Sequence, residues 1–171
     1  MESGGRRPSL AAALLAFLAC PTVVGFGVPL ALLALDAHPG RGHPGGWALV
    51  VLGVAALLAC VRDFYVVGKG TLAPWAPPSR LVVVGLYRHV RNPMYLAVLT
   101  LVGGLALLGG SVRVLAYGVV LALVFDARVR WAEEPRLASA FGPDWASYRA
   151  AVRRWWPRWR PWTGARPQKS G

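Results

Sequence analysis

The sequence is poor in charged residues, in acids and in cysteine. Only 15% of its 171 residues are charged and only seven are Asp or Glu, whereas roughly a quarter of an average soluble domain is charged. The two cysteines, Cys20 and Cys60, both fall inside apolar stretches. A disulfide framework and a cysteine-based metal site are therefore not indicated, and we interpret both thiols as small apolar packing groups.

What the chain has instead is long apolar stretches. Hydrophobic residues make up 56% of it, and a helix needs about 20 apolar residues to cross a bilayer. The first stretch follows Arg6 and Arg7 as in a signal peptide, but it is longer than the usual apolar region, so we predict that it is retained. We predict an all-α integral membrane bundle of four transmembrane helices, at about residues 10–35, 47–67, 93–108 and 112–129.

The positive charge is distributed unevenly along the chain. Most of the 19 Lys and Arg residues lie in the N-terminal segment, between residues 62 and 92, and from residue 128 onward, whereas the two remaining links carry only Arg41 and Arg113. Because positive residues collect on the cytoplasmic side of a membrane, we predict that both termini are cytoplasmic. The net charge of +12 then suits anionic lipid headgroups, and no nucleic-acid partner is expected.

Turn and capping signals divide the chain into segments. Asn92 and Pro93 are typical of a helix start, and Gly109–Ser111 is typical of a tight turn between antiparallel helices. Gly103 and Gly104 predict close approach of another helix. The predicted order is a cytoplasmic segment 1–9, two transmembrane helices in 10–67, a cytoplasmic loop 68–92, a helical hairpin 93–130, cytoplasmic or interfacial helices in 131–162 and a disordered tail 163–171.

Beyond the hairpin the pattern becomes amphipathic and rich in Trp and Arg. Pro135 predicts a bend at Glu134, because the residue before a proline avoids helical geometry. Gly142 predicts the end of a short helix, and a second helix is expected over residues 144–154. The mixture of aromatic and basic side chains predicts a position in the headgroup layer. The aromatic residues concerned are Trp131, Trp145, Tyr148, Trp155, Trp156, Trp159 and Trp162.

Two polar motifs bracket the predicted hairpin. The first, at residues 85–95, reads GLYRHVRNPMY and leads into it. The second begins with Glu133 and Glu134 directly after the hairpin and continues through Phe141 to Tyr148. Because a hairpin returns the chain to the face from which it started, both motifs are expected on the same side of the membrane. This placement predicts a site that acts on a molecule dissolved in, or anchored to, the bilayer.

The two motifs together resemble the isoprenylcysteine carboxyl methyltransferase family, and the related phospholipid N-methyltransferases share the same general plan. The resemblance covers about residues 80–160. It implies an integral membrane methyltransferase that uses S-adenosylmethionine to methylate a lipid-like or lipophilic acceptor at the cytoplasmic face. Where the commoner family pattern has His, this chain has Asn92, which forms hydrogen bonds but does not titrate. His89 is a candidate to replace it.

The resemblance also implies which residues line the cofactor pocket. A glutamate suits the ribose hydroxyls or the ammonium of the cofactor, and a tyrosine suits its adenine. An arginine suits its carboxylate or an anionic group of the acceptor, with Arg91 as the first candidate, followed by Arg88 and Arg154. We expect catalytic roles for Arg91 and Arg154. The expected cofactor-binding residues are Tyr87, Arg88, Arg91, Asn92, Pro93, Tyr95, Glu133 and Glu134.

Simpler interpretations of the same residues stay open. Tyr87, Arg88 and Arg91 are also typical of side chains that anchor a span at the interface. The two adjacent glutamates are also typical of solvated acids that balance Arg128, Arg130 and Arg136. Leu137, Phe141 and Tyr148 are more typical of packing residues than of ligands. No metal is expected, because His38 and His43 lie in a Gly/Pro loop where a pair of histidines is typically solvated.

Two other functions remain as alternatives. One is a membrane reductase of the same architecture that binds a nicotinamide dinucleotide. The other is a non-catalytic or transport protein with four helices, which is weakened because the centres of the predicted spans hold no ionisable residue. Asp63, at the end of the second span, either approaches the site or pairs with Arg62. Richness in Gly, Ala, Arg and Val favours a GC-rich genome and hence the bacterial inner membrane.

Overall fold

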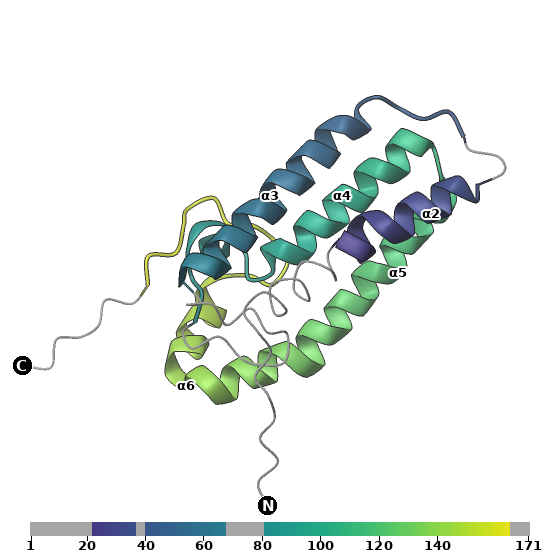
Figure 1. Ribbon diagram of the computed structural model, residues 1–171. Helices are drawn as coiled ribbons and strands as arrows, with labels where there is room; N and C mark the ends of the chain where they lie inside the picture. Colours follow the sequence, from purple (N-terminus) through teal and green to yellow (C-terminus); the bar gives the residue numbers. More distant parts are fainter. Residues whose placement is uncertain (1–21, 37–39, 68–80, 165–171) are drawn as a thin grey trace, which may run out of the picture.

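The computed structural model describes residues 22–36, 40–67 and 81–164 of the chain (Figure 1). Four sequence predictions lie wholly or partly outside these residues. They are the cytoplasmic segment 1–9, the first part of the transmembrane region 10–67, the first part of the loop 68–92 and most of the tail 163–171.

The described part of the chain is helical and contains no strand. The last three predicted spans, at residues 47–67, 93–108 and 112–129, begin and end within one residue of the observed helices. Pro93, Gly110 and Ser111 act locally at the ends that they flank. The elements are the π-helical turn η1 (Val23–Gly27), α2 (Val28–Ala34), α3 (Gly46–Val67), the 3-10 turn η2 (Gly85–Arg88), α4 (Pro93–Gly109), α5 (Val112–Arg128), the π-helical turn η3 (Val129–Glu133) and α6 (Glu134–Ala151).

Helix α4 lies at the centre of the bundle and contacts α3, α5, α2 and η1 (Figure 1). The turn after α4 places Gly110 in a left-handed conformation with φ of 58°. The hydroxyl of Ser111 then accepts a hydrogen bond from the backbone N–H of Val114 at 3.4 Å, which caps α5. The predicted tight turn between antiparallel helices is therefore confirmed.

One of the two predicted close-approach glycines carries the contact between α4 and α3. A Cβ atom at Gly104 would lie 2.8 Å from the backbone nitrogen of Val50 and 2.9 Å from the carbonyl oxygen of Gly46. A Cβ atom at Gly103 would meet nothing within 4 Å. Adjacent helical residues point about 100° apart, so only one of them can face α3. The prediction is confirmed for Gly104 and wrong for Gly103.

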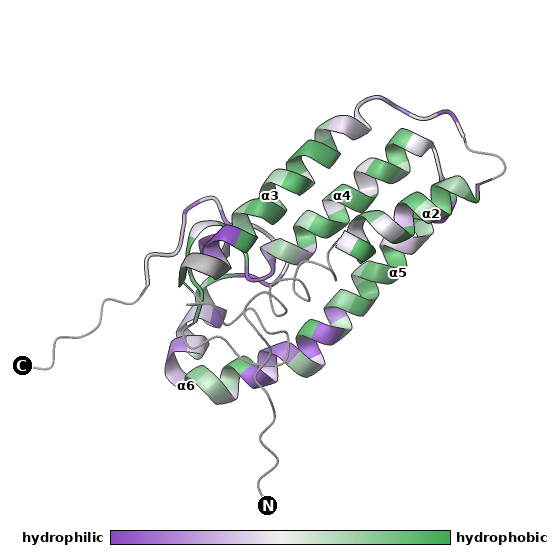
Figure 2. Ribbon diagram, viewed as in Figure 1, coloured by the Kyte–Doolittle hydropathy of each residue, from purple (hydrophilic) through white to green (hydrophobic). Residues whose placement is uncertain are grey.

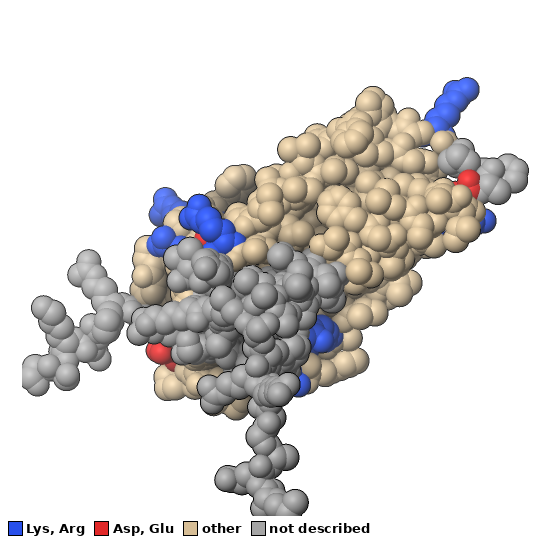
Figure 3. Space-filling view, in the orientation of Figure 1, with Lys and Arg blue, Asp and Glu red and all other residues tan. Residues whose placement is uncertain are grey.

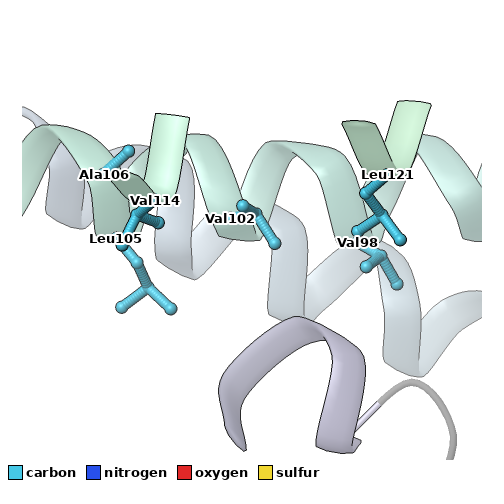
Figure 4. Close-up of a cluster of buried hydrophobic side chains, with 6 residues drawn as sticks. All are labelled: Val98, Val102, Leu105, Ala106, Val114 and Leu121. Carbon is cyan, nitrogen blue, oxygen red and sulfur yellow. The ribbon is translucent and has the colours of Figure 1, made fainter. Parts of the chain in front are cut away.

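The main hydrophobic cluster joins α4 to α5 (Figure 4). Figure 2 shows hydrophobic residues along the length of the bundle and more hydrophilic residues in α6 and at the adjoining end of α5. Many large apolar side chains also point outward from the bundle, for example Leu52 and Leu58 on α3 and Val119 and Leu123 on α5. The buried cluster consists of Val98, Val102, Leu105, Ala106, Val114 and Leu121.

Among the described residues, one stretch is both long and apolar enough to cross a membrane by itself. It is Gly46–Asp63 within α3, with 18 residues and a mean hydropathy of 1.8. The helical stretches Val23–Ala34 and Pro93–Gly109 are apolar but shorter. The described residues are thus all-helical with one clear candidate span, and the predicted set of four spans is not confirmed.

The chain passes from α5 through η3 into α6 without the predicted bend. Glu134 has helical φ and ψ of −61° and −41°, and Pro135 occupies the first turn of α6. A proline is tolerated in a first turn because its missing N–H is not needed there, and the hydrogen-bond pattern has just changed at the π turn. The bend lies instead at Gly142, with φ of 45° and ψ of −117°, which confirms the predicted end of a short helix.

Candidate functional site

The motif at residues 85–95 forms a loop, which includes η2 and ends at the first turn of α4, and the loop packs against α3 and α6. Gly85 has a φ of +52°, and a Cβ atom there would lie 2.0 Å from Oδ2 of the buried Asp63, so the position requires glycine. Asp63 therefore approaches the motif, and its Oδ1 also lies 3.8 Å from Nε of Arg62, so both alternatives for this residue are observed. Tyr87 is buried, and its carbonyl oxygen accepts a hydrogen bond of 2.7 Å from the hydroxyl of Tyr148 on α6. Its burial shows that Tyr87 is not an anchor at the molecular surface.

The chain segment after α6 runs along the same loop. We call residues 152–162 the strap. It contains no helix, and its backbone finds hydrogen-bond partners in the loop instead. The strap thereby fixes the loop through its backbone. Three backbone hydrogen bonds of 2.9–3.0 Å pair Arg91 with Arg153, His89 with Arg158 and Arg88 with Trp162.

The second motif contributes a buried carboxylate to this loop. Arg154 donates two hydrogen bonds to Glu134, from Nε at 2.7 Å and from Nη2 at 2.8 Å. Arg91 lies on the same carboxylate, with Nη1 3.0 Å from Oε1. The side chains of Arg91 and Glu134 are each only 9% exposed. One carboxylate thus holds two guanidinium groups, and the solvated interpretation of Glu134 is wrong.

The charges of this cluster shift one another's pKa values. Burial disfavours the charged form of Glu134, but the hydrogen bonds from Arg154 and the charge of Arg91 outweigh it and hold the pKa of Glu134 below its ordinary value. The hydrogen bonds to Glu134 raise the pKa of Arg154. Burial lowers the pKa of Arg91. The three groups are held as a charged cluster with one excess positive charge.

The neighbouring Glu133 has different partners. Its carboxylate accepts a hydrogen bond from the hydroxyl of Tyr95, near the start of α4. Arg128, at the end of α5, donates from Nε to Glu133 at 2.8 Å and to the Tyr95 hydroxyl at 3.1 Å. The ring of Tyr95 lies 4.3 Å from that of Phe125 between centroids. Glu133 therefore joins the start of α4 to the end of α5, the ends of the hairpin that are predicted to face the cytoplasm.

A small pocket of about 70 Å³ lies between the two glutamates. Its wall combines charged groups with aromatic and aliphatic side chains. A larger cavity of about 310 Å³ lies beside Arg88 and Trp162, but no carboxylate lines it. The smaller pocket is the better candidate site because it carries both signs of charge. It is lined by Leu81, Val82, Tyr87, Arg91, Asn92, Val129, Glu133, Glu134, Leu137, Trp145 and Tyr148.

Three buried N–H donors at this pocket have no hydrogen-bond partner among the described residues. They are Nε and Nη1 of Arg91 and Nε1 of Trp145. Nη1 is close to Glu134, but the contact is an ion pair without hydrogen-bond geometry. The guanidinium carbon of Arg91 lies 5.6 Å from the centroid of the Trp145 ring. Buried donors without partners are costly, so this group of N–H donors indicates a place for an acceptor group.

The structure brings together most of the residues that the sequence singled out. Five of them line the pocket, and Tyr95 and Arg154 contact its glutamates. Arg88 lies apart, because its Nε donates to the carbonyl oxygen of Trp162 at 2.7 Å. Pro93 is buried in the first turn of α4. The five lining residues are Tyr87, Arg91, Asn92, Glu133 and Glu134.

Two details of the first motif differ from expectation. Asn92 begins α4 but makes no side-chain cap; its Nδ2 donates to the carbonyl oxygen of Arg154 at 3.2 Å. His89 does not line the pocket, and its Nδ1 lies 2.8 Å from the carbonyl oxygen of Arg158 in the strap. Both side chains hold the C-terminal segment, since its irregular backbone offers free carbonyl oxygens.

Sequence reasoning missed Trp145 and Arg128 as parts of the site. Trp145 is 4% exposed, so its assignment to the headgroup layer is wrong, whereas the 2% exposure of Tyr148 agrees with the packing role that the sequence favours for it. The missed signal is a helical spacing: Trp145, Tyr148 and Val152 recur at intervals of three and four and are buried together, and the partly buried Phe141 packs against them. Arg128 was counted only as a charge that balances nearby acids.

Among the residues that the structure describes, no group of three or more His, Cys, Asp or Glu side chains is placed to hold a metal ion. A family model described as phospholipid methyltransferase matches residues 44–144 of the chain. The match includes α3, the first motif, the hairpin and both glutamates. Comparison with curated proteins and with solved structures gave no match.

Proposed function

Because the chain belongs to the phospholipid methyltransferase family, we propose that it is an integral membrane enzyme that transfers a methyl group from S-adenosylmethionine to an amphiphilic, lipid-like acceptor. The observation that supports this most is the Arg91–Glu134–Arg154 cluster: Arg91 has two buried N–H donors without a hydrogen-bond partner and lines a pocket with a second carboxylate, Glu133. A buried site with both charges is unusual in an apolar bundle and suits a zwitterionic ligand.

The residues present fit the cofactor chemically. The amino-acid end of S-adenosylmethionine carries a carboxylate and an ammonium, which would bind to Arg91 and to a glutamate oxygen, respectively. The aromatic walls from Tyr87, Trp145 and Tyr148 suit a purine ring. The pocket of about 70 Å³ is smaller than the roughly 300–1,000 Å³ of ordinary ligand sites. Binding therefore requires its side chains to move apart.

When bound, the cofactor supplies the electrophilic methyl group. The protein contributes alignment and exclusion of water, because an in-line displacement depends chiefly on geometry. Arg91 is the residue that we expect to touch the cofactor. Arg154 is a positioning residue: its two hydrogen bonds to Glu134 orient the carboxylate on which Arg91 rests. The strap adds a backbone hydrogen bond from the Arg91 N–H to the carbonyl oxygen of Arg153.

We further propose that η1 with α2, α3, α4 and α5 cross or enter the bilayer as the four predicted spans. With 22 residues, α3 is about 33 Å long, and with 17 residues each, α4 and α5 are about 26 Å long. The outward apolar side chains of α3 and α5 support this placement, because water would not stabilise them. The site then lies at the cytoplasmic interface, where an acceptor can enter from the lipid.

The first test is binding of S-adenosylmethionine to the detergent-purified full chain by calorimetry. We expect one site, lost in Glu133→Gln/Glu134→Gln and retained in Asp144→Asn, which removes an exposed acid of α6. Transfer of a labelled methyl group into a bacterial lipid extract would then identify the acceptor class. Absence of binding by protein with an intact helical circular dichroism spectrum would overturn the proposal, and binding of a nicotinamide dinucleotide would support the reductase.

A further inference from the structure

The strap has two different faces. Its backbone and the side chains of Arg154 and Trp155 turn inward: Arg154 bonds to Glu134, and the indole Nε1 of Trp155 donates to Asp126 of α5 at 2.8 Å. The side chains of Trp156 and Trp159 point outward and are 73% and 99% exposed. Pro157 and Pro161 prevent the strap from forming a helix that could bury them.

The exposed face of the strap is positively charged as well as aromatic. Arg153 and Arg160 are exposed, and within the described ranges neither has a carboxylate at ion-pair distance. The strap itself contains no acid. The nearest acids are occupied, because Asp126 pairs with Arg130 and Glu134 pairs with Arg154. The positive charge of the outer face is therefore available to a partner outside the molecule.

We propose that the outer face of the strap, formed by Arg153, Trp156, Trp159 and Arg160, binds the anionic headgroups of the membrane surface and thereby holds the loop that carries Arg91. The inference rests on the membrane placement proposed above. Tryptophan is enriched in the headgroup layer, where its ring contacts the acyl chains and its N–H forms hydrogen bonds with water or headgroups. Arginine beside it adds attraction to negatively charged lipid.

The position of the strap favours a lipid surface as its partner. In Figure 3 the visible Lys and Arg side chains gather toward the ends of the bundle, whereas the described surface between them is largely uncharged. The strap lies at the end where α3 stops and α4 begins (Figure 1). A segment at the rim of an apolar bundle meets headgroups as soon as the bundle is inserted. Any lipid contact made by Trp156 or Trp159 restrains the backbone that is hydrogen-bonded to the loop.

The test uses the full chain in lipid nanodiscs that contain brominated phosphatidylcholine or, at the same mole fraction, brominated phosphatidylglycerol. Bromine quenches tryptophan fluorescence on contact. We expect at least twofold stronger quenching by the anionic lipid. Trp156→Phe/Trp159→Phe and Arg153→Gln/Arg160→Gln should each abolish this preference. Arg41→Gln/Arg113→Gln, which removes the same charge at the opposite end of the bundle, should retain it.

A second measurement links the strap to the site. Amide hydrogen exchange in the loop around Arg91 should slow severalfold when phosphatidylglycerol replaces phosphatidylcholine, and Arg153→Gln/Arg160→Gln should remove that difference. Equal quenching by the two lipids, or loop exchange indifferent to lipid charge, overturns the proposal. Trp47, which is 63% exposed at the far end of α3, distinguishes failure of the strap proposal from failure of the membrane placement. If Trp47→Phe also leaves quenching unchanged, the membrane placement itself is wrong.

Discussion

Arg154 holds Glu134 through two parallel hydrogen bonds of 2.7 and 2.8 Å, although twenty residues separate them in the chain. This pair closes the C-terminal segment onto the start of α6. Because Arg91 shares the same carboxylate, the geometry of the first motif depends on a contact made entirely within the second motif and the strap. A change in the position of one motif is therefore expected to change the position of the other.

Glu134→Gln should destabilise the protein strongly. The substitution keeps the shape of the side chain but leaves two guanidinium groups without their countercharge, and breaking a buried ion pair costs roughly 3–5 kcal/mol. Such a loss corresponds to a fall in melting temperature of about 6 °C or more for a chain of this size. Circular dichroism melting in detergent measures it. Asp144→Asn, an exposed acid on the same helix, should leave the melting temperature unchanged.

The stability of the protein should decline in acid through Glu134. Its pKa is lower in the folded protein than the ordinary value of 4.5. The ionised carboxylate therefore stabilises the fold fully above about pH 4.5, and that contribution is lost as the pH falls through the lowered value. Melting curves between pH 7 and pH 3 should show the decline. In Glu134→Gln the same curves should be flatter, and an equally steep decline would contradict the assignment.

Tyr95 and Glu133 should act as a coupled pair. Tyr95→Phe removes the hydroxyl that bonds to the carboxylate and also a partner of Arg128. We expect Tyr95→Phe and Glu133→Gln each to lower methyl transfer about tenfold, which corresponds to about 1.4 kcal/mol. The double variant should be little worse than either single one, because both remove the same contact. Fully additive losses in this double-mutant cycle would show that the two residues act independently.

Trp145→Phe should weaken cofactor binding. The change preserves an aromatic ring but removes the indole N–H that has no partner among the described residues. Loss of one hydrogen bond of about 1 kcal/mol predicts a roughly fivefold higher dissociation constant for S-adenosylmethionine by calorimetry. Trp162→Phe is the matched control, since its ring packs 5.4 Å from that of Tyr148 but does not line the pocket. An unchanged affinity in Trp145→Phe would remove this residue from the site.

Gly103 and Gly104 offer a matched pair for testing the α3–α4 contact. Gly104→Ala places a methyl group 2.8–2.9 Å from the backbone of α3 and should force the helices apart. Gly103→Ala meets nothing and should be neutral or stabilising, because alanine favours a helix by about 1 kcal/mol over glycine. Melting temperatures should therefore move down for Gly104→Ala and stay level or rise for Gly103→Ala. A reversed order would contradict the helix orientation.

The helices could be predicted from local signals, whereas the site depends on contacts between residues that are far apart in the sequence. Asn92 and Pro93 mark the start of α4, and Gly110 and Ser111 mark the turn after it, because such residues act on the backbone next to them. The proximity of Arg91 to the Glu133–Glu134 pair followed from the hairpin together with a family resemblance. Neither identified Arg154 as the direct partner of Glu134, since contacts of an irregular segment have no periodicity to reveal them.

The aromatic residues show where composition misleads. Trp145 and Trp159 occur in the same Trp- and Arg-rich stretch, yet one is 4% exposed and the other 99%. Only helical spacing separates them: Trp145 shares a face of α6 with Tyr148, whereas Trp159 lies within the strap, between Pro157 and Pro161. Asn92 shows a similar limit, because its side chain was expected to cap α4 and instead bonds to a carbonyl oxygen 62 residues away.

The orientation of the two site glutamates depends on the number of residues in the π-helical turn η3. Glu133 closes that turn and Glu134 begins α6, so the adjacent carboxylates diverge, one toward Tyr95 and the other toward Arg154. Removing one residue between Val129 and Glu133 would rotate everything after it by about 100°. The two carboxylates would then no longer point toward Tyr95 and Arg154, although no functional side chain had been replaced. This stretch should accept substitutions more readily than a change of length.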